Sequence, residues 1–218
     1  MAKEDTLVIH EIYASIQGES TFAGVPCTFV RTTGCNLRCS WCDTTQAFKG
    51  GTRMARSEVF AKALSFDTQV VELTGGEPLL QPGVIPLLRE LCDAGRTVLV
   101  ETSGEADISK VDPRVHRIMD LKAPLSGESH RNRLSNLDFL TPNDELKFVL
   151  AGREDYEWMR TMIATHALAS RVPTLLASTV FGKLAARTLV AWVLEDKLPV
   201  RVQLQMHKYI WAPETQGV

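Results

Sequence analysis

The sequence predicts an α/β fold, a partial and open β/α barrel with a mostly parallel sheet, from two observations. Short apolar runs rich in Val, Ile, Leu and Thr alternate along the chain with longer segments of helical periodicity. This alternation is typical of strand–helix units whose parallel strands are buried on both faces. The chain has 218 residues, fewer than a closed eight-unit barrel of about 250 residues needs. We therefore expect roughly six units in a single domain spanning residues 1–218.

Strands are expected wherever a short apolar run occurs. These runs are Leu7–Ala14, Cys27–Thr32, Val70–Thr74, Thr97–Glu101, Arg117–Leu121, Glu145–Leu150, Thr174–Ala177 and Val200–Gln205. Helices are expected between them, each with one apolar side. They are Arg56–Phe66, Gly83–Ala94, Glu154–Ser170 and Ala185–Glu195. The second should stop before Gly95, because glycine tolerates the left-handed conformation that ends many helices.

Composition and charge exclude several classes of protein. The 24 basic and 26 acidic residues give a formal net charge of -2, so bulk electrostatics do not indicate a nucleic-acid binder. No apolar run approaches the ~18 residues of a membrane span. The first five residues are polar, unlike a signal peptide. A cytoplasmic enzyme or binding domain is the expectation.

Three of the five cysteines, Cys35, Cys39 and Cys42, lie within eight residues of one another. The spacing Cys-x3-Cys-x2-Cys lets three thiolates converge from one loop on one inorganic centre. A 4Fe–4S cluster held by three cysteines keeps one iron open for a ligand. A structural zinc site is the alternative, but it needs a fourth ligand, which would have to come from His10, His207 or Cys92. Cys27 and Cys92 are interpreted as buried small hydrophobes.

This cysteine spacing, with Trp41 directly before the last cysteine, resembles the signature of the radical S-adenosylmethionine (SAM) superfamily. The resemblance implies a 4Fe–4S cluster whose open iron binds SAM, and a radical that abstracts hydrogen, with no catalytic residue beyond this cofactor chemistry. A Gly-Gly-Glu-Pro turn after the strand at Val70 is a second mark of the superfamily. The SAM-binding residues that the resemblance implies are Trp41, Asp43, Gly75, Gly76, Glu77, Ser103 and Lys122.

Nearly the whole chain is similar to the 7-carboxy-7-deazaguanine synthase family. The similarity is carried by Glu11–Ser20, Pro26–Leu37, Trp41–Thr44 and the tail segment His207–Trp211. It implies a radical ring contraction of 6-carboxy-5,6,7,8-tetrahydropterin to 7-carboxy-7-deazaguanine with release of ammonia. That product is a precursor of 7-deazapurines such as queuosine in transfer RNA, so the substrate is a free pterin rather than a nucleic acid.

The same resemblance implies a set of substrate-binding residues. Arg31 would pair with the substrate carboxylate, as a guanidinium can in a two-bonded geometry. Thr44 would bind Mg²⁺ together with that carboxylate, and Asp43 is a neighbouring carboxylate. The remaining implied contacts to the substrate are Ile16, Gln17, Gly18, Glu19, Thr74, His207 and the C-terminal Val218.

The resemblance also implies partners: a second copy of the chain in a homodimer, and an electron donor such as flavodoxin or ferredoxin. Two other functions stay open at this point. A glycyl-radical-enzyme activase would share the three cysteines and the glycine turn, but should lack the combination of Gln17, Gly18, Glu19 and Arg31. A non-enzymatic zinc-binding domain would be colourless.

Overall fold

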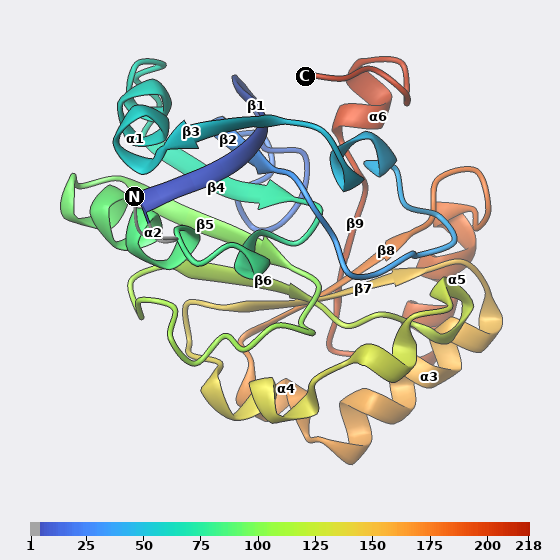
Figure 1. Ribbon diagram of the computed structural model, residues 1–218. Coiled ribbons are helices and arrows are strands. Elements are labelled where there is room, and N and C mark those ends of the chain that lie inside the picture. The colour runs from blue at the N-terminus through green and yellow to red at the C-terminus, as the bar shows by residue number, and fades with distance from the viewer. Residues whose placement is uncertain (1–4) are drawn as a thin grey trace.

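The computed structural model describes residues 5–218, and in this part of the chain nine strands form one sheet (Figure 1). The strands follow the order β3-β1-β2-β4-β5-β6-β7-β8-β9. Strand β1 is antiparallel to both β2 and β3, whereas all pairs from β2 to β9 are parallel. Their bounds are β1 Thr6–Ile16, β2 Pro26–Thr32, β3 Thr52–Ala55, β4 Val70–Gly75, β5 Thr97–Thr102, β6 His116–Asp120, β7 Glu145–Leu150, β8 Thr174–Thr179 and β9 Arg201–Gln203. The open, mostly parallel sheet confirms the predicted fold class.

The helices lie mainly along one side of the sheet, with α1 and α2 near β3 to β5 and α3 to α5 near β7 and β8 (Figure 1). They are α1 Arg56–Leu64, α2 Val84–Asp93, α3 Arg153–Thr165, α4 Leu168–Arg171, α5 Ala186–Asp196 and α6 His207–Ile210. Short 3-10 helices occupy loops at Thr45–Phe48, Pro78–Leu80, Pro124–Ser126, Ser129–Arg131 and Leu134–Phe139. No helix within residues 5–218 is long and apolar enough to cross a membrane.

Every expected strand is present, but one expected helix ends earlier than predicted. The segment expected as Glu154–Ser170 ends at Thr165, and Ala167 takes a left-handed conformation with φ of 49° before α4 begins. The last turn of the pattern therefore belongs to a separate short helix. Strand β3 and helix α6 were not expected, because each has four residues and little apolar periodicity. Gly95 follows α2 with φ of 77°, as its position predicted.

The main core lies between the sheet and the helices α1 to α5. Strand residues alternate between the two faces of the sheet, so Val71 and Leu73 on β4 face this core together with Val98 and Val100 on β5. Helix α2 contributes the fully buried Leu88. Burial of this apolar surface stabilises the fold and fixes which face of each strand turns away from the helices.

The opposite, inner face of the sheet has a smaller apolar cluster under a polar layer. The cluster consists of Cys27, Phe29, Val70, Leu99 and Ile118, so the prediction that Cys27 is buried is confirmed. Further along these parallel strands, and on β7 beside them, stand polar side chains. Because parallel strands end at one edge of the sheet, these side chains meet there. They are Arg31, Glu72, Thr74, Glu101, Asp120 and Lys147.

Candidate functional site

Two adjoining cavities open on the inner face of the sheet. The larger has a volume of about 650 Å³ and the smaller about 130 Å³. They share walls that include Glu19, Arg31 and Thr74. A volume of 650 Å³ lies in the range of small-molecule and cofactor pockets. Together the cavities lie at the carboxyl ends of the parallel strands, where ligands bind in folds of this type.

The larger cavity brings together the three clustered cysteines and most of the residues predicted to bind SAM. Cys35, Cys39 and Cys42 all line it. From the predicted cofactor set, it is also lined by Trp41, Asp43, Gly75, Gly76, Ser103 and Lys122. These residues come from the loop 33–44, called here the cysteine loop, and from the ends of β4, β5 and β6. The fold therefore brings together residues that lie far apart in the sequence.

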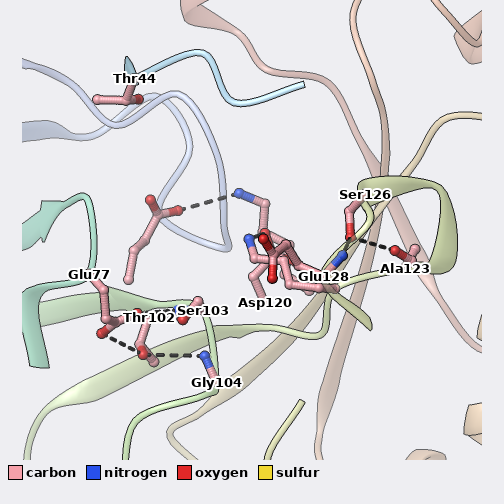
Figure 2. A network of polar contacts seen from close by, with 12 residues as sticks. Thr44, Glu77, Thr102, Ser103, Gly104, Asp120, Ala123, Ser126 and Glu128 are labelled. Atoms are coloured by element: carbon pink, nitrogen blue, oxygen red, sulfur yellow. Dashed lines mark hydrogen bonds and ion pairs between the residues drawn. The ribbon is translucent and has the colours of Figure 1, made fainter. Parts of the chain in front are cut away.

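Neighbouring segments hold the cysteine loop in place. The backbone N–H of Arg38 donates to Glu128 Oε1 at 2.6 Å, and that of Ser40 donates to the Ser126 carbonyl at 3.0 Å. The Arg38 guanidinium lies 4.3 Å from the centre of the Phe48 ring and donates to the Cys35 carbonyl at 2.8 Å. Glu128 and Ser126 belong to one short segment (Figure 2), which braces the loop from one side.

Three thiolates are suitable ligands for an iron–sulfur cluster, although burial of the three cysteine thiols opposes their ionisation. Burial raises the pKa of all three thiols, so cluster assembly would release protons. Lys122 counters this effect. Burial disfavours its charge, but Asp120, whose Oδ2 accepts from Nζ at 2.9 Å, raises the pKa of Lys122 well above its usual value. A fixed cation therefore stands near the thiols and favours the thiolate form. Three thiols on the wall of one cavity, beside a lysine ammonium, are a donor set of the kind that holds a 4Fe–4S cluster with one open iron.

The glycine turn after β4 packs directly on the start of the cysteine loop. The Glu77 N–H donates to the Gly34 carbonyl at 2.8 Å. A Cβ added to Gly76 would stand 2.8 Å from the Cys35 Cβ and overlap the Gly34 backbone. Gly75 has φ of 144° and leaves no room for a side chain against Thr32. Only glycine therefore lets the turn and the loop approach this closely.

Glu77, predicted to bind SAM, lies off both cavities, and its carboxylate is fully engaged by protein atoms (Figure 2). Oε1 accepts from the Thr102 hydroxyl at 2.9 Å and from the Leu79 N–H at 3.0 Å. Oε2 accepts from both the N–H and the hydroxyl of Ser103, each at 2.7 Å. Glu77 is completely buried. Its place in the structure is that of a brace which fixes Ser103 on the cavity wall.

The smaller cavity is lined by every residue predicted to bind the substrate. They are Ile16, Gln17, Gly18, Glu19, Arg31, Thr74, His207 and Val218. These residues come from the end of β1, from β2 and β4, from α6 and from the C-terminus. Asp43 and Thr44 line both cavities, so they stand at the boundary between the predicted cofactor and substrate regions.

Arg31 is held by two partners on the adjacent strand β1. Its Nε donates to Glu11 Oε1 at 2.7 Å and its Nη2 donates to the Tyr13 hydroxyl at 3.0 Å. Glu11 and Arg31 face each other in the antiparallel register of β1 and β2. The guanidinium side chain is 17% exposed, and it lines both cavities. A guanidinium fixed in this way presents its remaining donors to an anion with little loss of side-chain freedom.

A buried network of charges joins the two cavities, and two of its members, Glu72 and Lys147, were not assigned to the site by the sequence analysis. Lys147 Nζ pairs with Glu19 and lies 3.5 Å from Glu101 Oε1. Glu72 accepts a hydrogen bond from Gln17 Nε2, while Gln17 Oε1 accepts from the Glu19 N–H at 3.0 Å. The Gln17 amide is thus locked in one orientation. The signal for Glu72 and Lys147 was present: each is a charge inside an apolar strand run, as Arg31 is.

Burial and neighbouring charges together shift the pKa values of the groups in this network. Burial, together with the nearby Glu101 carboxyl, raises the pKa of Glu72 well above its usual value. Burial disfavours the charge on Lys147, but Glu101 and Glu19 outweigh it and raise the pKa of that lysine. In turn, Lys147 lowers the pKa of Glu19 against the effect of burial. The network therefore favours a charged Lys147–Glu19 pair and disfavours the ionised form of Glu72.

The segment from Gln205 to Lys208 closes the site from the C-terminal side. Gln205 Nε2 donates to Glu19 Oε1 at 2.9 Å, and the Met206 N–H donates to the Gly18 carbonyl at 2.9 Å. A side chain on Gly18 would overlap the His207 ring. Burial lowers the pKa of His207, so its imidazole is neutral at pH 7.

Lys208 is enclosed by the site. Its Nζ donates to Asp43 Oδ2 at 2.7 Å and its side chain is only 9% exposed. Asp43 Oδ1 accepts the Thr44 hydroxyl at 3.0 Å. Partial loss of solvent around Asp43 would raise its pKa, but the Lys208 ammonium overcomes this effect and lowers the pKa to about 2. The hydroxyl and carboxylate are hard oxygen donors of the kind that Mg²⁺ prefers. Figure 2 places Thr44 apart from the Glu77 brace.

Comparison with known proteins gives consistent matches along the sequence. The family model described as "Radical SAM superfamily" matches residues 29–181. The chain is 48% identical to the 7-carboxy-7-deazaguanine synthase of Chlorobaculum tepidum, over 100% of both chains. It is 47% identical to the enzyme of the same name from Koribacter versatilis, over 96% of this chain and 99% of the relative.

Solved structures agree on the fold. QueE from Escherichia coli superposes with a TM-score of 0.72 at 20% identity, over 93% of this chain and 95% of that one. Streptococcus suis SuiB bound to the precursor peptide SuiA superposes with a TM-score of 0.62 at 9% identity, over 81% of this chain and 47% of SuiB.

Proposed function

Because the chain belongs to the 7-carboxy-7-deazaguanine synthase family of the radical SAM superfamily, we propose that it converts 6-carboxy-5,6,7,8-tetrahydropterin into 7-carboxy-7-deazaguanine. The reaction is a radical ring contraction that releases ammonia, and its product feeds 7-deazapurine synthesis such as that of queuosine for transfer RNA. The chain is an enzyme, a lyase of this family.

One observation carries the proposal. All residues expected to bind the substrate line the smaller cavity, and this cavity adjoins the one lined by Cys35, Cys39 and Cys42. A substrate in the smaller cavity would lie against the cofactor in the larger one. Radical transfer needs this proximity, since the reacting atoms must be in contact before hydrogen can move.

The cofactor chemistry divides between the bound group and the chain. A 4Fe–4S cluster with SAM supplies a 5′-deoxyadenosyl radical able to remove a hydrogen atom from the pterin. The chain itself would hold the cluster and SAM, orient the substrate and exclude water from the site. Cys35, Cys39 and Cys42 would hold the cluster. The SAM contacts proposed are the backbone of Gly75 and Gly76, the side chains of Trp41, Asp43, Ser103 and Lys122, and Glu77 through its brace on Ser103.

Substrate recognition follows from the fixed charges of the inner face. Arg31, clamped by Glu11 and Tyr13, would bind the substrate carboxylate. The orientation-locked amide of Gln17, with Gly18 and Glu19, would satisfy the polar edge of the pterin, because unpaired buried donors and acceptors are costly. Thr74, Ile16, the neutral His207 and the Val218 terminus would complete the wall. Thr44 would bind Mg²⁺ together with the carboxylate of the substrate.

The wider setting of the enzyme is also a proposal. We propose a single radical SAM domain over residues 1–218, working in the cytoplasm as a homodimer. Electrons would come from a flavodoxin or ferredoxin. The near-neutral charge supports a free small molecule, rather than a nucleic acid or membrane, as the partner of the site.

An anaerobic assay tests the proposal. Reconstituted protein is mixed with SAM, a reductant, Mg²⁺ and 6-carboxytetrahydropterin, and the product is sought by mass spectrometry, with SAM omitted as the control. We expect 7-carboxy-7-deazaguanine with SAM regenerated. Reductive cleavage of SAM without this product would contradict the proposed substrate and favour a glycyl-radical activase.

A further inference from the structure

Lys208 places a positive charge beside the oxygen atoms that the magnesium proposal uses. Its ammonium is bonded to one oxygen of Asp43, and the other oxygen of Asp43 accepts the hydroxyl of Thr44. All three side chains line both cavities. The Asp43 side chain is 47% exposed, whereas that of Lys208 is 9% exposed. The carboxylate is therefore open to a solute, and the ammonium is held against it.

Three other cations that line the cavities each have an anionic partner. Arg31 pairs with Glu11, Lys122 with Asp120, and Lys147 with Glu19. Asp43 and Lys208 likewise form a balanced pair. A divalent cation that binds Thr44 and Asp43 would add two positive charges next to the ammonium. In a partly enclosed site this repulsion is screened less than in bulk water, so it opposes binding of the ion.

We propose that Lys208 competes with a divalent cation for Asp43 and thereby sets the affinity of the site for that ion. The inference rests on the proposed role of Thr44 and deepens it. By linkage, the ion weakens the Lys208–Asp43 bond as much as the lysine weakens ion binding. That bond is one of the contacts that hold the segment 205–208 over the smaller cavity, beside Gln205–Glu19 and Met206–Gly18. Ion binding and docking of this segment are therefore coupled.

Binding of Mn²⁺ to the holoenzyme, followed by electron paramagnetic resonance, tests the proposal without turnover. Cluster-loaded protein with SAM and the pterin, but without reductant, is titrated with Mn²⁺. We expect Lys208→Met and Lys208→Gln to bind Mn²⁺ at least about tenfold more tightly than the wild type. Lys208→Arg keeps the charge and should match the wild type, and Thr44→Ala should lose affinity. Lys183→Met is the matched control, because it removes a lysine of the larger cavity that lies over Trp41.

Cluster absorbance and SAM binding identify the variants that fold. If Lys208→Met does not fold, the Mn²⁺ affinity of Lys208→Gln decides the test. Unchanged or weaker Mn²⁺ binding in both neutral variants would overturn the proposal, since the lysine would then support the site. Absence of Mn²⁺ binding in the wild type would overturn the proposal together with the magnesium site. The product assay decides the synthase activity separately, so the two failures are distinguishable.

Discussion

The two faces of the sheet use the same strands for opposite purposes. On β4, Val71 and Leu73 face the helices and belong to the main apolar core, whereas Glu72 and Thr74 face the cavities. The outer face gains stability from buried apolar surface. The inner face buries charges such as Lys147 and Glu72, which cost desolvation energy unless they are paired or neutralised. The outer face therefore accounts mainly for the fold, and the inner face for the function.

The largest effect is expected at the cysteine loop, on the functional side of this division. Cys39→Ala should abolish cluster binding and activity, because one of three ligands is lost. Iron and sulfide content and visible absorbance after anaerobic reconstitution would measure it. Cys92→Ala, on helix α2 beside the outer core, is the control and should keep the cluster. A brown Cys39→Ala protein with full iron would refute the ligand assignment.

The sequence predicted the fold well, and the three clustered cysteines line one cavity, because strand periodicity and cysteine spacing are both local patterns. Strand periodicity and the spacing of Cys35, Cys39 and Cys42 are readable in short windows. The direction of the Glu77 carboxylate was not readable, since it depends on backbone geometry at the glycine turn. The contact between Lys208 and Asp43 joins residues 165 positions apart, so no local sequence pattern could predict it.

The outer face should show its role in stability. Leu73→Ala removes a fully buried side chain from the main core and should lower the free energy of unfolding by about 2–5 kcal/mol. Chemical denaturation measures the loss. Leu194→Ala on α5 is the control, because Leu194 is 70% exposed and should change stability by no more than about 0.5 kcal/mol. Equal effects for the two variants would contradict the placement of the core.

Substitution of Glu11 tests the role of the inner face in substrate binding. Glu11→Gln weakens the clamp on Arg31, so the KM for the pterin should rise about tenfold while kcat changes little. Steady-state kinetics under anaerobic conditions separate the two constants. Glu157→Gln, which removes the charge from exposed ion pairs on α3, should leave KM unchanged. A fall in kcat at constant KM would show that Glu11 does not act by positioning Arg31.

Substitution of Glu72, next to Leu73, should raise the free energy of unfolding, whereas Leu73→Ala lowers it, and the change should be smaller. Its raised pKa means that the folded state keeps a proton that the unfolded state loses, so stability falls as pH rises above about 4.5. Glu72→Gln keeps an acceptor for Gln17 and removes this penalty. We expect a gain on the order of 1 kcal/mol at pH 8 that vanishes below about pH 4.5. Thermal unfolding across this pH range would measure it, and a loss of stability at pH 8 would indicate that Glu72 is ionised and paired.

The most direct test of the central claim, that the inner-face charges bind the substrate, is the affinity of the holoenzyme for 6-carboxytetrahydropterin. It is measured without reductant in the wild type and in Arg31→Lys. The account predicts that binding weakens about tenfold or more, because lysine cannot reproduce the fixed two-donor geometry. Iron content and SAM affinity should stay unchanged. Equal substrate affinity in the two proteins would contradict the claim and place the carboxylate of the substrate elsewhere.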